Sequence, residues 1–139
     1  MPKITSDLIR KKAEKYRNYA SEALSELIRI RSFSGREEEV IKFLEREFAS
    51  CGASEVTIDN FGNVLARLGN RGPVIAFDAH VDTVDVGQEG SWSFDPFGGE
   101  IRAGCVLGRG AVDQKAGMAS MLAALKIIYE SSSDLPFTL

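Results

Sequence analysis

The stretch VIAFDAHVDT, residues 74–83, decides the expected fold. Its first six residues, Val74 to Ala79, are nearly all apolar and rich in β-prone types, which is typical of a strand covered on both faces. Such a strand lies in the middle of an α/β sheet, with helices packed on either side. The pattern therefore predicts a central strand that ends just before His80.

Three other stretches show the spacing of apolar residues that is typical of helices. In each of them, apolar residues recur at steps of three to five and form one apolar face. The second stretch begins at SGRE, residues 34–37, where a serine and a glutamate three positions apart match a capping box. The predicted helices run from Asp7 to Ile30, from this capping box to Ser50, and from about Lys115 to Tyr129.

Short β-rich stretches predict two hairpins and a last strand. One hairpin has Gly62 in its turn, and the other has Ala103-Gly104. A long loop follows the central strand, and its aromatic residues should anchor it. The first hairpin pairs Glu55 to Ile58 with Val64 to Leu68, and the second pairs Glu100 to Ile101 with Val106 to Leu107. The predicted loops cover Thr83 to Gly99 and Ser131 to Asp134, and the last strand covers Leu135 to Leu139.

The alternation of helices and strands predicts an α/β fold in one domain that spans residues 1–139. We expect three αβα layers around a mixed, mostly parallel sheet. The last strand pattern stops at Leu139, which would leave an exposed sheet edge. Such an edge favours self-association.

The composition argues against two classes of partner. Basic and acidic residues number 17 and 20, for a net charge of −3, and they are mixed along the chain. There is thus no basic surface for nucleic acid or anionic lipid. No apolar run approaches the ~18 residues of a membrane-spanning helix, and no signal peptide is visible. We expect a cytoplasmic protein in which Cys51 and Cys105 are reduced thiols.

The single histidine lies directly after the predicted central strand. Side chains alternate along a strand, so His80 and Asp82 should point to the same face. A carboxylate beside an imidazole can fix the orientation of a metal-binding histidine. The carboxyl ends of strands are also where ligands bind in open α/β sheets. On these residues alone, a structural histidine stays an open alternative to a metal ligand.

A second cluster precedes the last predicted helix. In the sequence GRGAVDQKAG, residues 108–117, the glycines permit close backbone approach and could present Asp113 at the mouth of that helix. Asp113 could equally be a helix cap, because aspartate is a preferred residue there. The local sequence does not separate these two interpretations.

The order of these motifs resembles a family of zinc-dependent hydrolases. This family includes aminoacylases, acetylornithine deacetylase, succinyl-diaminopimelate desuccinylase and carboxypeptidase G. The resemblance extends from about Ser32 to Leu139. Three motifs carry it, namely His-x-Asp-Thr at residues 80–83, Trp92 with Asp95-Pro96-Phe97, and Gly-Arg-Gly-x-x-Asp-x-Lys at residues 108–115.

The resemblance implies a zinc-exopeptidase-like fold and hydrolysis of amide bonds in small molecules, either N-acyl amino acids or short peptides. It implies two divalent metal ions, with zinc favoured over cobalt or manganese. His80 would bind one ion, Asp82 would be a catalytic residue that orients His80, and Asp113 would bridge both ions. The family often has a cis peptide bond after this aspartate, so we predict one between Asp113 and Gln114.

The resemblance also implies parts that this sequence lacks. A Glu-Glu pair that supplies the general base and a metal ligand, further ligands, and a lid and dimerisation domain would all follow Leu139. We therefore expect the N-terminal portion of a catalytic domain, with an incomplete active site, partial or no metal occupancy and no activity alone. A natural, non-catalytic binding or assembly module is the alternative. A phosphotransferase with Asp78 or Asp82 as nucleophile fits worse, because those enzymes use Asp-x-Asp.

Overall fold

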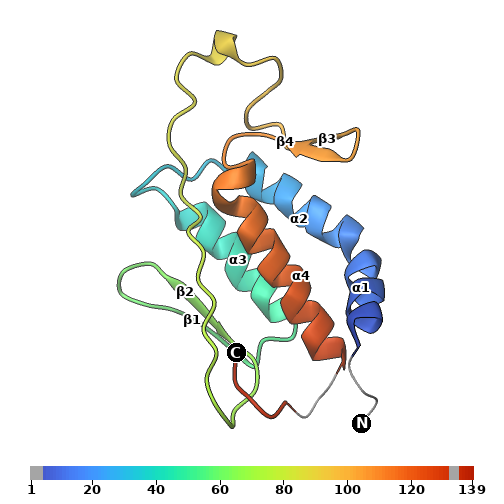
Figure 1. The fold of residues 1–139 in the computed structure, drawn as a ribbon. Helices are drawn as coiled ribbons and strands as arrows, with labels where there is room; N and C mark the ends of the chain where they lie inside the picture. Colours follow the sequence, from blue (N-terminus) through green and yellow to red (C-terminus); the bar gives the residue numbers. More distant parts are fainter. Residues whose placement is uncertain (1–4, 132–134) are drawn as a thin grey trace.

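The computed structural model describes residues 5–131 and 135–139, and it combines helices with short strands (Figure 1). The predicted α/β class is confirmed. No helix among the described residues is long and apolar enough to span a membrane. The elements are α1 (Ser6–Lys15), α2 (Arg17–Arg29), α3 (Glu38–Ser50), β1 (Glu55–Ile58), β2 (Val64–Arg67), η1 (Glu89–Ser91), β3 (Glu100–Arg102), β4 (Cys105–Leu107), η2 (Ala111–Lys115) and α4 (Ala116–Ser131).

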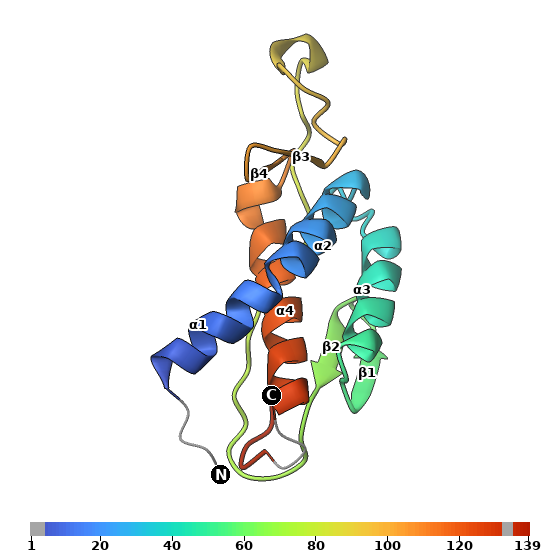
Figure 2. The same cartoon turned by 90° about the vertical axis from the view of Figure 1, so that its right-hand side faces the viewer.

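The predicted single helix from Asp7 to Ile30 is wrong, because the structure breaks it at Tyr16 into α1 and α2. Tyr16 leaves the helical conformation, with φ −98° and ψ 6°, and its side chain is buried. The axes of α1 and α2 therefore differ in direction (Figure 1), although the two helices follow nearly one line in the turned view (Figure 2). This change brings α1 to the end of α4, where Lys15 forms an ion pair with Glu130. Apolar periodicity continues through the break and so could not reveal it.

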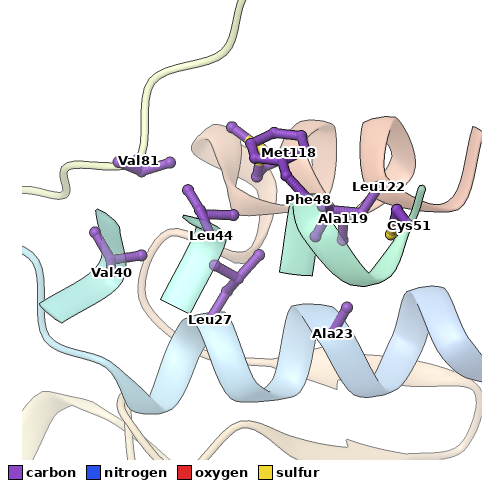
Figure 3. Packing of buried hydrophobic residues seen from close by; sticks show 10 residues of the cluster. All are labelled: Ala23, Leu27, Val40, Leu44, Phe48, Cys51, Val81, Met118, Ala119 and Leu122. Carbon is purple, nitrogen blue, oxygen red and sulfur yellow. The ribbon is translucent and has the colours of Figure 1, made fainter. Parts of the chain in front are cut away.

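The core lies between helices α2, α3 and α4 (Figure 3). Helix α2 packs against α4, and α3 packs against the hairpin of β1 and β2. Val81, from the stretch that follows the predicted central strand, also joins this core. The buried cluster consists of Ala23, Leu27, Val40, Leu44, Phe48, Cys51, Val81, Met118, Ala119 and Leu122.

The predicted capping box at the start of α3 does not form. Glu37 occupies the N-cap position without a side-chain hydrogen bond to the helix, and its carboxylate instead accepts from the N–H of Gly35. The hydroxyl of Ser34 points elsewhere and donates to the carboxylate of Asp82. A long-range partner has therefore replaced the local cap that the spacing predicted.

Both predicted hairpins are present. Strands β1 and β2 pair antiparallel, and their turn is closed by Asp59, whose carboxylate accepts from the backbone N–H groups of Phe61 and Asn63. Gly62 in this turn has φ +86°, which favours glycine. Strands β3 and β4 pair antiparallel in the same way around Ala103 and Gly104. Local turn chemistry determines both hairpins.

The predicted central strand from Val74 to Ala79 is not formed. Its pairing is limited to one end, where Val74 forms a parallel bridge with Thr138 and the N–H of Ile75 donates to Thr138. The side chains of Val74 and Phe77 are 73% and 68% exposed. A strand covered on both faces needs partners along its whole length, and the described residues supply them only at this end.

The predicted mostly parallel sheet between two helix layers is correspondingly absent from the residues that the structure describes. Their paired strands form two antiparallel hairpins, and parallel pairing is limited to two isolated bridges. The last predicted strand, Leu135 to Leu139, is formed only at its end: Pro136 and Phe137 lie in a bend, Thr138 forms an isolated bridge, and Leu139 exchanges two backbone hydrogen bonds with Leu68. The predicted loop from Ser131 to Asp134 falls on residues 132–134, which lie outside the described residues.

The loop from Thr83 to Gly99 is anchored by aromatic residues, as predicted. Phe97 is buried, and its ring packs edge-on against Phe33, with ring centroids 6.1 Å apart. Within the loop, Trp92 packs against Phe94 and its indole N–H donates to the carbonyl of Val86. The part that contains η1 extends away from the helices (Figure 1).

Lys115 ties the start of α4 to the end of α2. Its side chain is 1% exposed, and its ammonium group donates to the carbonyls of Leu27 at 2.7 Å and Ile30 at 2.8 Å. Carbonyls at the end of a helix lack intrahelical partners, and a lysine can satisfy them. Burial lowers the pKa of Lys115 to about 8. The two hydrogen bonds thus offset part of the cost of burying the ammonium group.

We predict that Lys115→Met lowers the free energy of unfolding by about 2 kcal/mol, because buried helix-end carbonyls lose their donor. Urea denaturation followed by circular dichroism measures this change. Lys11→Met in α1, where the side chain is exposed, is the matched control and should have little effect. Equal stability of the two variants would contradict the role assigned to Lys115.

Candidate metal centre

The imidazole of His80 lies between two carboxylates. Its Nδ1 is 3.1 Å from Oδ1 of Asp82 and 3.2 Å from the backbone carbonyl oxygen of Asp82. Its Nε2 is 2.9 Å from Oδ1 of Asp113. The structure thus brings together the three residues that the sequence singled out. Their roles in metal binding and catalysis remain predictions.

Backbone pairing with the segment after α2 holds His80 and Asp82 in place. Phe33 forms a parallel bridge with Thr83, and the N–H of Thr83 donates to the carbonyl of Ser32 at 2.8 Å. The buried hydroxyl of Ser32 donates to the carbonyl of Val81 at 2.7 Å. Val81 itself is buried in the core. This pairing fixes the backbone segment that carries the side chains of His80 and Asp82.

A tight turn positions Asp113. Gly110 has φ +77°, and a Cβ atom there would lie 2.5 Å from the Cγ2 of Thr83, so the turn requires glycine. Asp113 has non-helical φ −119° and ψ 96°, and the predicted cis peptide bond between Asp113 and Gln114 is confirmed. The carboxylate of Asp113 contacts His80, and its role as a metal ligand stays a prediction.

The two carboxylates shift the protonation of the site. The hydrogen bond with Asp113, supported by contacts with Asp82, raises the pKa of His80 above its ordinary value of 6.5. The hydrogen bond from Ser34, followed by the contact with His80, lowers the pKa of Asp82. The imidazolium therefore stabilises the fold below pH 6.5, and this contribution is lost as the pH rises through the raised pKa of His80.

The donor atoms fit a divalent cation. The groups near Nδ1 and near Nε2 are all oxygen acceptors, so when an ion takes the lone pair of Nε2, a neutral His80 carries its proton on Nδ1 and donates it to the acceptors there. An ion with ligand distances of about 2.0–2.2 Å can bridge an N···O separation like that between Nε2 and Asp113. The side chains of His80 and Asp113 are 45% and 87% exposed. Solvent and ions can therefore reach them.

Among the described residues, no group of three or more His, Cys, Asp or Glu side chains is arranged to hold a metal ion. Asp82 contacts Nδ1 of the imidazole, whereas Asp113 contacts Nε2. Asp82 therefore orients His80 and lies on the other side of the ring from Asp113. His80 and Asp113 are therefore the candidate ligands that this part of the chain contributes. Both cysteines are free thiols, and Cys51 is buried.

Sequence reasoning missed two residues around the site. Ser34 was assigned to a helix cap, but its hydroxyl contacts Asp82. Lys115 was noticed only as part of a motif, but it anchors the turn that carries Asp113. Both act through contacts with residues distant in sequence, and no local pattern signals such contacts.

We predict that Asp113→Asn lowers the pKa of His80 toward 6.5, because a neutral amide accepts a weaker hydrogen bond than the carboxylate and no longer attracts the imidazolium by its charge. His80 is the only histidine, so its ring protons report this pKa directly in an NMR titration. Asp7→Asn in α1 makes the same change of charge in another element and should leave the pKa of His80 unchanged. An unshifted pKa in Asp113→Asn would contradict the contact.

Comparisons with known proteins find relatives over the part of the chain that carries these residues. A profile of peptidase family M20/M25/M40 matches residues 76–139, which include His80, Asp82 and Asp113. The uncharacterized protein YgeY of Escherichia coli (strain K12) is 38% identical over 132 residues, which cover 95% of this chain and 33% of that protein. Succinyl-diaminopimelate desuccinylase of Methylorubrum extorquens (strain PA1) is 41% identical over 105 residues, which cover 70% of this chain and 27% of that enzyme.

A solved structure shares the fold. The crystal structure of human carnosine dipeptidase 1 matches with a TM-score of 0.75 at 20% sequence identity, covering 99% of this chain and 34% of that one. The chain thus spans about a third of the length of the relatives it matches. The profile match over residues 76–139, the two relatives and the predicted motifs all point to the same family, and this chain is similar to peptidase family M20/M25/M40.

Proposed function

We propose that this chain contributes the His80–Asp113 half of a dinuclear metal centre to a hydrolase of amide bonds. The observation that carries the proposal is the 2.9 Å separation of His80 Nε2 and Asp113 Oδ1. Similarity to peptidase family M20/M25/M40 and to a desuccinylase supports a metal-dependent amide hydrolase. Zinc suits an imidazole and a carboxylate, and cobalt or manganese could replace it.

In this proposal each residue has a separate role. His80 supplies a neutral nitrogen ligand, and Asp113 supplies a carboxylate that bridges two ions. Asp82 keeps the proton on Nδ1 of His80 and so directs Nε2 toward the ion. A bound divalent cation supplies Lewis acidity, which polarises an amide carbonyl and lowers the pKa of a water molecule. The general base would come from a residue outside this set.

The proposed substrates are small molecules, either N-acyl amino acids or short peptides. One relative is named for the removal of a succinyl group from diaminopimelate, and the similar structure is named for the cleavage of a dipeptide. Both reactions break an amide bond. We further propose a cytoplasmic location and a mixed, mostly parallel sheet in the zinc-exopeptidase manner, of which the two parallel bridges are the beginning.

The alternative is a non-catalytic binding or assembly module that keeps the hydrolase fold. It is favoured by the absence of a three-ligand cluster among the described residues, since catalytic zinc sites use about three protein ligands. Incubation with zinc, cobalt or manganese, followed by an assay with N-acetyl amino acids and dipeptides, separates the two proposals. Turnover that disappears in His80→Ala, by this chain or by a longer protein that contains it, supports the hydrolase and contradicts the module.

We predict that zinc binds this chain weakly and shifts the ring signals of His80 in NMR spectra. Binding should strengthen as the pH rises above 6.5 through the raised pKa of His80, because zinc needs the neutral imidazole. Asp113→Asn should weaken binding, and Asp7→Asn should not. Zinc-induced shifts that leave His80 unaffected in the unaltered chain would contradict the proposal.

We also propose self-association through the unpaired segment 74–79. Among the described residues, backbone pairing of this segment is limited to its contact with Thr138, and Val74 and Phe77 are exposed. An exposed apolar edge of this kind can pair with the same edge of a second copy around a twofold axis.

We predict that sedimentation velocity detects a concentration-dependent dimer, and that Phe77→Glu makes the chain monomeric. Phe61→Glu, at another exposed phenylalanine in the turn between β1 and β2, is the control and should leave the dimer intact. A monomer at every concentration, or equal effects of the two variants, would contradict this edge as the interface.

A further inference from the structure

The hydroxyl of Ser34 contacts the carboxylate that orients His80. Its Oγ donates to Oδ2 of Asp82 at 2.5 Å, while the other carboxylate oxygen, Oδ1, lies 3.1 Å from Nδ1 of His80. The two oxygens of Asp82 thus have two different partners. An ionised carboxylate only accepts hydrogen bonds, so Ser34 must be the donor. The length of the contact is that of a charge-assisted O–H···O⁻ bond.

This bond determines how the carboxylate of Asp82 is turned. The torsion that rotates a carboxylate has a broad energy profile, so rotamer preference alone would not hold Oδ1 toward His80. With Oδ2 fixed by Ser34, Oδ1 faces Nδ1. When Nδ1 carries the proton, Oδ1 and the backbone carbonyl of Asp82 both accept from it. Nε2 is left as the nitrogen that faces Asp113.

The position of Ser34 is set independently of this contact. The parallel bridge between Phe33 and Thr83, with the hydrogen bonds of Ser32 to Val81 and Thr83, aligns residues 32–34 with residues 81–83. Ser34 is exposed and makes no contribution to the buried cluster. Removal of its hydroxyl should therefore leave the fold intact and affect only the bond with Asp82.

We propose that Ser34 is a positioning residue of the metal centre, which acts through Asp82 to hold His80 with its proton on Nδ1 and with Nε2 directed at Asp113. Three consecutive contacts, from Ser34 to Asp82, from Asp82 to His80 and from His80 to Asp113, carry this effect. The metal-binding part of the inference rests on the proposed function, whereas the effect on His80 does not.

The test compares Ser34→Ala with Ser34→Thr, which keeps a hydroxyl, and with Ser21→Ala, which removes a hydroxyl that donates within its own helix. Long-range ¹H–¹⁵N NMR spectra above the pKa of His80 give the ratio of its two neutral tautomers without overlap, because the chain has one histidine. Backbone amide spectra check that each variant is folded.

In Ser34→Ala, we expect the share of the Nδ1–H tautomer to fall and zinc affinity to drop about tenfold, the lower end of the effect of outer-sphere partners. Ser34→Thr should restore both values, and Ser21→Ala should change neither. An unchanged tautomer ratio in folded Ser34→Ala would overturn the inference. If zinc leaves His80 unaffected in the unaltered chain, the proposed function fails, and the tautomer ratio still decides the role of Ser34.

Discussion

The segment that follows α2 contacts both parts of the candidate site, namely the segment with His80 and Asp82 and the turn with Asp113. At its start, the carbonyl of Ile30 accepts a hydrogen bond from the buried Lys115, which anchors the turn that carries Asp113. Ser32 then pairs with the backbone next to His80, and Ser34 contacts Asp82. Buried donors and acceptors that lose their partners are costly, so these contacts define one arrangement of the two halves. The short distance between His80 and Asp113 depends on them.

This arrangement leaves an imidazole between two carboxylates. Without a cation, the imidazolium carries a proton on each ring nitrogen and donates to both carboxylates, which explains why the pKa of His80 is raised. A divalent ion next to Nε2 would replace that proton and compensate the charge of Asp113 more fully. The charge distribution of the site is therefore suited to a cation. The neighbouring apolar segment 74–79, with Val74 and Phe77 exposed, is suited to pairing with a further strand.

The sequence predicted the elements that local chemistry determines. The two hairpins follow from their turn residues, such as Gly62, and the proximity of His80, Asp82 and Asp113 followed from motif order and family resemblance. Where long-range contacts decide, prediction failed. The break at Tyr16 depends on packing, the strand from Val74 to Ala79 lacks partners along most of its length among the described residues, and the hydroxyl of Ser34 bonds across the fold instead of capping a helix.

The central claim is that His80 and Asp113 share one cation. Anomalous X-ray diffraction at the zinc absorption edge, from crystals of this chain grown with zinc, tests it most directly. The account predicts an anomalous peak within about 2.0–2.2 Å of both Nε2 of His80 and a carboxylate oxygen of Asp113. A zinc peak elsewhere with none between these two groups, or a peak bound to His80 through Nδ1, would contradict it.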